Sequence, residues 1–188
     1  MKLIAALACL AVVAYGNECG DKLAEKLIAI NGDFLSAATL KDLMQQTFDQ
    51  YYNQNKTLKE IADYYYKNYN NLDSLSSDQI DQITNVINNI TQCVGGPDAF
   101  TKLHNQVQET ALDFVKADQA QVDSLIKQQR ASNAPVEDVE TAVCQKTFEL
   151  VTLQKKIELE NKLWPLVPEN CLATTKAAVS TVFKVHAA

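Results

Sequence analysis

The sequence predicts an all-α fold: a single-domain bundle of six or seven helices around a long antiparallel helical hairpin, with two disulfides. Three observations lead to this prediction. Apolar residues recur at every third or fourth position through most of the chain, which is typical of amphipathic helices. No segment shows the alternating pattern of a strand, and only five glycines and four prolines are present. Five cysteines occur in a chain that begins like an exported protein, where disulfides form readily.

Residues 1–16 have the pattern of a secretory signal peptide. Lys2 provides the positive start, residues 3–13 the apolar stretch, and Ala14-Tyr15-Gly16 the small residues of a cleavage site. The apolar run is too short to form a stable membrane anchor. We therefore expect residues 17–188 to be a single helical domain that is secreted to the extracellular space.

The shorter helices come first in the mature chain and return at its end. Turn-forming residues such as Asn31-Gly32-Asp33 separate them, and Thr57 to Glu60 forms a capping box that opens one of them. The segment from Trp164 to Pro168 contains two prolines and predicts a rigid, mostly extended crossover. Outside the hairpin we expect helices over residues 20–31, 36–52, 57–69, 76–92 and 171–186.

The hairpin is expected to span Pro97 to Leu163. Two glycines end the preceding helix, and Pro97 suits the first turn of the next one. One apolar face continues to about Arg130, residues 131–135 interrupt it, and a second apolar face follows. Because the connector is short, the two helices should be antiparallel neighbours, and residues whose numbers sum to about 266 should lie at the same level.

Polar residues interrupt the two apolar faces at matching levels. Asp118 lies in the middle of the first face and Lys146 in the middle of the second, and their numbers sum to about the required value. We therefore expect Asp118 and Lys146 to meet as a structural ion pair that sets the register of the hairpin. By the same rule, His104 and Asn161 should form a hydrogen-bonded pair in the core.

The cysteines of the mature chain are expected to be structural. Cys19, Cys93, Cys144 and Cys171 have spacings unlike those of a zinc site. Cys93 precedes the hairpin and Cys171 follows it, so both should lie at its open end. Cys144 lies well inside the second helix and points off its apolar face. This geometry favours the pairs Cys93–Cys171 and Cys19–Cys144 among the three that are possible.

Two sequons for N-glycosylation are present. Asn55 begins Asn55-Lys56-Thr57 in a polar loop, and Asn89 begins Asn89-Ile90-Thr91 on the polar side of a helix. Both asparagines could carry a glycan without disturbing a core. We therefore expect a glycoprotein.

Charge excludes two classes of partner. Without Lys2 the chain holds 16 basic and 23 acidic residues, a net charge of −7. Nucleic acids and anionic membrane surfaces require basic patches, so neither is an expected partner. The acidic residues are spread along the helices, as on an ordinary solvated surface.

Tyrosines are concentrated in one part of the chain. Three in succession cannot all face one core, so at least one should be exposed or point into a cavity. A face of this kind suits an apolar ligand or a protein partner, because tyrosine combines a large ring with a polar end. The alternative is a core helix with large side chains at its edges. The six tyrosines between positions 51 and 69 are Tyr51, Tyr52, Tyr64, Tyr65, Tyr66 and Tyr69.

No pattern in the sequence points to catalysis, a cofactor or a metal. The two histidines are far apart, and no nucleophile motif, phosphate-binding loop or calcium loop occurs. The expected function is that of a secreted, non-catalytic binding protein, a carrier of a lipid-like or other apolar small molecule. A cavity lined by Tyr51, Tyr65 or Tyr69 would favour the carrier. The alternative is a secreted signalling or immune-modulating effector that uses the tyrosine-rich face to bind a protein.

Overall fold

The computed structural model describes residues 18–186, which form eight α-helices and no strand. The predicted signal peptide over residues 1–16, with Cys9, lies outside the described residues. The all-α fold with two disulfides is confirmed. The α-helices are α2 (Glu18–Asn31), α3 (Ala37–Phe48), α4 (Leu58–Asn68), α5 (Ser77–Cys93), α6 (Pro97–Ala131), α7 (Val136–Leu150), α8 (Leu153–Leu163) and α9 (Glu169–Ser180). A π-helical turn over Asp49–Asn53 extends α3, and 3₁₀ turns follow α4 and α8 at Tyr69–Asn71 and Trp164–Leu166.

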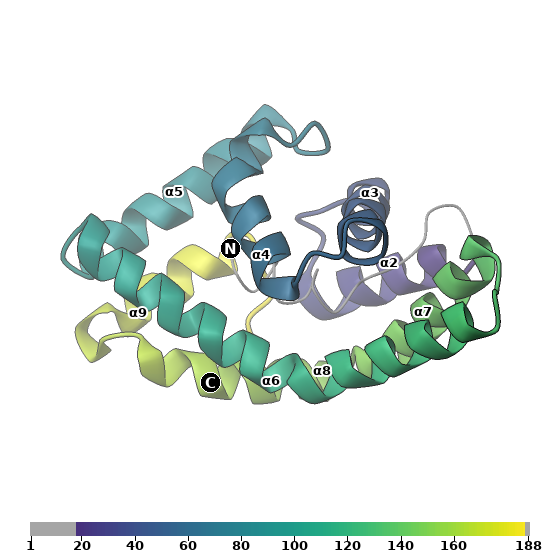
Figure 1. Cartoon of the computed structure of the whole chain (residues 1–188). Helices are drawn as coiled ribbons and strands as arrows, with labels where there is room; N and C mark the ends of the chain where they lie inside the picture. The colour runs from purple at the N-terminus through teal and green to yellow at the C-terminus, as the bar shows by residue number, and fades with distance from the viewer. Residues whose placement is uncertain (1–17, 187–188) are drawn as a thin grey trace.

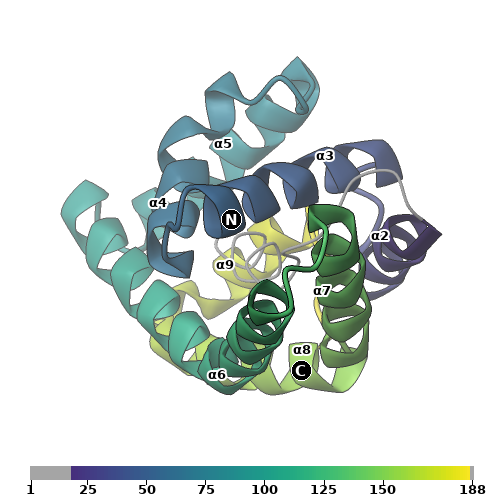
Figure 2. The same ribbon diagram turned by 45° about the vertical axis from the view of Figure 1, so that its right-hand side comes forward.

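Helix α6 is the longest element, and the other helices are arranged along it (Figure 1). The chain reverses after Ala131, and α7 and α8 return along α6 as the second arm of the hairpin. At the end of α6 nearest its start, α5 and α9 pack against each other. At the opposite end, α2 and α3 cover α7, as the turned view in Figure 2 shows. The predicted hairpin is therefore present and organises the fold.

The second arm of the hairpin is broken into two helices. Val151 and Thr152 adopt extended backbone, with φ/ψ of −78°/110° and −135°/154°. β-branched side chains favour this conformation, and Val151 is buried in a cluster with residues of α2 and α3. The Thr152 hydroxyl then accepts a hydrogen bond of 3.2 Å from the backbone N–H of Lys155 and caps α8. This break corrects the single helix that the sequence predicted and explains why residues 18–186 form eight helices rather than six or seven.

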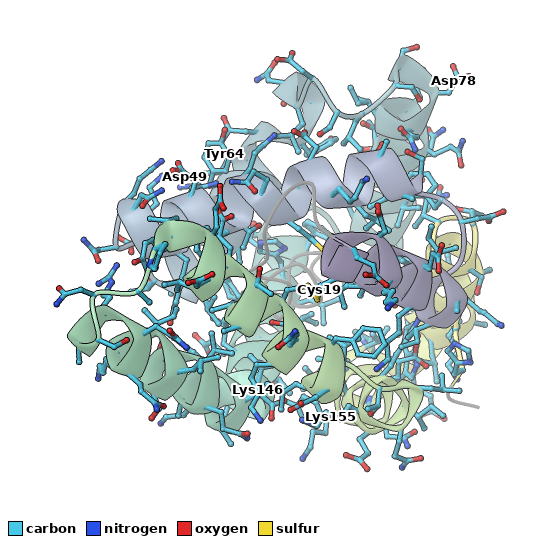
Figure 3. All side chains as sticks on the ribbon, turned by 90° about the vertical axis from the view of Figure 1, so that its right-hand side faces the viewer. Cys19, Asp49, Tyr64, Asp78, Lys146 and Lys155 are labelled. Carbon is cyan, nitrogen blue, oxygen red and sulfur yellow. A yellow bond between two sulfur atoms is a disulfide. The ribbon has the colours of Figure 1, made fainter. Side chains whose placement is uncertain are left out.

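The predicted Asp118–Lys146 ion pair is wrong. The partner of Asp118 is Lys155 on α8, with 2.5 Å between Nζ and Oδ2. Lys146 instead pairs with Glu149 on its own helix, at 3.1 Å. Figure 3 labels both lysines, one on α7 and the other near the start of α8. Lys146 lies on α7, before the break at residues 151–152, and its side chain is 31% exposed. Beyond the break, Lys155 of α8 lies beside Asp118 instead.

The predicted core pair of His104 and Asn161 is also wrong. Asn161 is exposed on α8. The ring of His104 instead packs against that of Tyr66, with 3.8 Å between the ring centroids. Asn161 lies beyond the break at residues 151–152, so the change of register there separates it from His104 on the unbroken helix α6.

The disulfides join Cys19 to Cys144 and Cys93 to Cys171, the pairing that the hairpin geometry favours. The Cα atoms lie 6.2 Å and 5.6 Å apart, within the usual range for a bridge. The first bridge fastens α2 to α7, and the second joins the end of α5 to the start of α9. The two bridges therefore hold the shorter helices at opposite ends of the hairpin.

The core is divided among several clusters along α6. The largest lies where α3, α4, α6 and α7 meet, and its members Phe48, Val115, Val139 and Val143 are fully buried. A separate cluster joins α5, α6 and α9 through Val86, Leu103, Ala178 and Phe183. None of the described helices is long and apolar enough to cross a membrane.

We predict that Lys155→Met lowers the free energy of unfolding by about 2 kcal/mol, because the mostly buried Asp118 carboxylate loses its partner. The matched control is Lys146→Met, whose loss of a surface pair with Glu149 should change stability by about 0.5 kcal/mol or less. Urea unfolding of the two variants measures the difference. Equal destabilisation by both substitutions would contradict the observed register.

Candidate functional site

An apolar cavity of about 120 Å³ lies where α5, α6 and α9 come together beside the end of α8. Each helix contributes the apolar side of its surface to the wall. Val86, Ile87 and Ile90 come from α5, and Phe100, Leu103 and Val107 come from α6. Val179 of α9, Leu163 of α8 and Val167 complete most of the remaining wall.

The turns and the disulfide around the cavity determine how these helices are connected there. Gly95 and Gly96 have φ of 101° and 108°, a conformation that glycine adopts readily, so α6 can begin directly after α5. The bridge between Cys93 and Cys171 fixes α5 to α9 at one end. The crossover from α8 is shorter than predicted, because residues 164–166 form a 3₁₀ turn and only Val167 and Pro168 are extended.

A few polar groups reach the cavity wall. Tyr66 and His104 line it with their rings in contact, and burial raises the pKa of Tyr66, with a smaller contribution from Tyr69. Trp164 and Thr175 also line it. Within the described part of the chain, the buried indole Nε1 of Trp164 and the hydroxyl of Thr175 have no hydrogen-bond partner.

A buried ion pair lies beside the cavity. Lys156 and Glu160 of α8 are almost completely buried, and Lys156 Nζ is 3.5 Å from Glu160 Oε1. Burial lowers the pKa of Lys156, and the nearby Glu160 carboxylate offsets part of this effect. Lys156 also donates a hydrogen bond of 3.2 Å to the carbonyl oxygen of Ile30. Because Glu160 lines the cavity, its charge contributes to the environment of any ligand there.

The same ion pair holds the end of the chain against α8. Lys156 donates to the carbonyl oxygen of Lys184, and Glu160 Oε2 accepts a hydrogen bond of 2.8 Å from the backbone N–H of His186. Val185, between these two residues, lines the cavity. The C-terminal segment (residues 184–186) therefore forms part of the cavity wall, anchored by buried charges.

The six clustered tyrosines do not form one face. Tyr65 is buried, and its hydroxyl donates to the carbonyl oxygen of Leu43 at 3.0 Å. Tyr69 exchanges a hydrogen bond of 3.1 Å with Thr84. Tyr66 is the member that lines the cavity, whereas the sequence had favoured Tyr51, Tyr65 or Tyr69 for this position.

The remaining three tyrosines lie near α6 or at the surface. The hydroxyl of Tyr51 donates to the carboxylate of Asp123. Tyr52 stacks on Phe48 with 5.0 Å between ring centroids, and the guanidinium of Arg130 lies 4.3 Å from the Tyr52 ring. Tyr64 is 38% exposed and is labelled on the surface in Figure 3. Most of this cluster is therefore used in packing.

Both predicted glycosylation sites are accessible. Asn55 is exposed between the π-helical turn and α4, and Asn89 is exposed on α5. Their use as glycan attachment sites stays a prediction. Among residues 18–186, no group of three or more histidine, cysteine or acidic side chains is arranged to hold a metal ion.

Comparison of the chain with protein-family models, with curated proteins and with solved structures finds no match.

Sequence reasoning did not single out Trp164, Thr175 or Lys156. The available signal for Trp164 was its position as the one tryptophan of the chain, next to a proline. Thr175 and Lys156 resemble the other polar residues of their helices, and only their tertiary neighbours distinguish them.

We predict that Lys156→Met lowers the free energy of unfolding by about 3–5 kcal/mol, because Glu160 keeps a buried charge without its cation. The double variant Lys156→Met/Glu160→Leu removes both charges and should recover part of this loss. Thermal and urea unfolding measure both effects. A double variant as unstable as the single one would show that the pair is not energetically coupled.

We predict that the free energy of unfolding falls as the pH rises from about 10 to 12, in part because of Tyr51. Burial, and then the hydrogen bond to Asp123, raise the pKa of Tyr51 to about 12. Between its unfolded and folded pKa, only the folded protein keeps the proton, so deprotonation favours unfolding. In the Tyr51→Phe variant, the free energy of unfolding should fall less over this pH range. Urea unfolding at each pH measures the difference. An unchanged pH dependence would contradict this assignment.

Proposed function

We propose that this protein is a secreted, non-catalytic binding protein that carries a small apolar molecule in the cavity between α5, α6 and α9. The observation that carries the proposal is the cavity itself, whose wall is formed mainly by aliphatic and aromatic side chains. Apolar cavities bind apolar molecules, because a ligand restores the dispersion contacts that the wall lacks.

The size of the cavity limits the ligand. Its volume of about 120 Å³ is close to that of an engineered cavity of about 150 Å³ that binds benzene. It is smaller than the roughly 300–1,000 Å³ of pockets for drug-sized ligands. A single ring or a short branched chain therefore suits it as it stands. A longer lipid-like ligand would need α9 or the C-terminal segment to move outward.

Several features support an extracellular setting. Two disulfides fit an oxidising compartment, and the first 16 residues have the pattern of a signal peptide. Two exposed sequons are available for glycans. These features together support the proposal that the carrier is secreted.

The alternative proposal, a secreted effector that binds a protein through its tyrosines, has less support. Five of the six tyrosines are buried or half-buried, and only Tyr64 is exposed. Protein interfaces use clustered aromatic anchors, and a lone exposed tyrosine does not provide one. The carrier is therefore the function that we favour.

Titration of the isotopically labelled mature protein with toluene, followed by NMR, tests the proposal. We expect shifts at residues of α5, α6 and α9, and binding that is about tenfold weaker in Val179→Phe, whose larger side chain fills the cavity. Val136→Phe is the matched control, because Val136 is 49% exposed at the start of α7 and lies away from the cavity.

Native mass spectrometry of protein from its natural source provides an independent measurement. We expect a small co-purifying molecule in the wild-type protein and none in the Val179→Phe variant expressed in the same source. A clean mass together with no toluene-dependent shift would overturn the carrier and favour the effector.

A further inference from the structure

Among the described residues, two in the cavity wall carry a buried polar atom that has no hydrogen-bond partner. Thr175 is 4% exposed on α9, and Trp164 begins the 3₁₀ turn after α8. In the part of the chain that the structure describes, neither Thr175 Oγ1 nor Trp164 Nε1 has a hydrogen-bond partner. Leaving such groups buried and unsatisfied is costly, so native proteins rarely do so without a reason.

Other helical threonines of this protein satisfy their hydroxyl within their own helix. A helical threonine can donate its hydroxyl to the carbonyl four residues earlier. Thr47 and Thr84 do so at 2.8 Å, and Thr101 does so at 2.9 Å. Thr175 does not form this bond. Its hydroxyl is covered by neighbouring atoms in this structure, so a hydrogen bond to a molecule in the cavity would require the Thr175 side chain to turn toward it.

The charge beside the cavity restricts the ligand further. Glu160 lines the wall and is almost completely buried. Lys156 and the backbone N–H of His186 contact its carboxylate. A second carboxylate brought into this low-dielectric setting would be repelled by Glu160. The cavity therefore favours a neutral ligand.

We infer that the ligand is a neutral, mostly apolar molecule with one oxygen acceptor, such as a small ketone, aldehyde or alcohol. This inference rests on the proposed function. The oxygen accepts hydrogen bonds from the Trp164 indole N–H and the Thr175 hydroxyl, and a carbonyl oxygen has the two lone pairs needed for both. The apolar part of the ligand fills the space between α5, α6 and α9.

Two probes of nearly the same shape test the inference. Cyclohexanone has a carbonyl oxygen where methylenecyclohexane has a CH₂ group, so their affinities differ mainly through hydrogen bonding. In NMR titrations of the full mature chain, we expect cyclohexanone to bind at least about tenfold more tightly. The anion cyclohexanecarboxylate should bind more weakly than cyclohexanone.

Thr175→Val and Trp164→Phe should reduce the preference for cyclohexanone, because each removes one donor and keeps an apolar side chain. Thr175→Val should also leave the melting temperature unchanged or raise it, since it removes an unsatisfied buried group without changing the shape. Thr147→Val is the matched control. The Thr147 hydroxyl is likewise buried without a partner among the described residues, but it does not line the cavity. It should keep the wild-type preference.

The possible results separate the two proposals. Equal affinity for cyclohexanone and methylenecyclohexane would overturn the acceptor inference and leave the apolar carrier standing. Failure of both molecules to bind would overturn the carrier as well. Tightest binding by the carboxylate would overturn the neutral-ligand assignment. If Trp164→Phe does not fold, Thr175→Val alone decides whether the preference depends on the wall.

Discussion

The packing of α7 and α8 along α6 is the constraint on which the rest of the structure depends. Helix α6 has 35 residues and is therefore about 52 Å long. No single short helix could cover its whole length. Much of its apolar face is buried because the chain returns along it in two pieces. The extended residues Val151 and Thr152 let the second piece change direction. The ion pair between Asp118 and Lys155 then fixes the position of α8 on α6.

The two disulfides extend this scaffold in opposite directions. The Cys19–Cys144 bridge fastens α2 to α7, where the neighbouring clusters are densely filled by aliphatic side chains. The Cys93–Cys171 bridge fastens α5 to α9, where the helices leave a cavity. Between the two ends, Lys156 and Glu160 bind both α2 and the C-terminal segment through their hydrogen bonds. Buried ion pairs add little net stability, so a role in positioning suits this pair better.

The cavity combines features that a protein optimised for stability alone would avoid. Empty volume lowers stability, and unsatisfied polar atoms lower it further. Cavities and unsatisfied polar atoms of this kind occur most often at functional sites. Here the two features coincide in space, since Trp164 and Thr175, which carry unsatisfied polar atoms, both line the same apolar hollow. This coincidence is the reason to regard the hollow as a binding site for a neutral small molecule.

The sequence by itself determined the helices, their caps and the hairpin, because these depend on periodicity and on neighbours within a few residues. The capping box at Thr57 and Glu60, for example, forms as its spacing predicts. The favoured cysteine pairs followed from the same local geometry and are the ones observed. Only the tertiary structure decided the partner of Asp118, because the break at Val151 arises partly from burial against α2 and α3. The fate of the tyrosines and the position of the cavity also lay beyond the sequence, since a hollow is the space left between helices after all of them have packed.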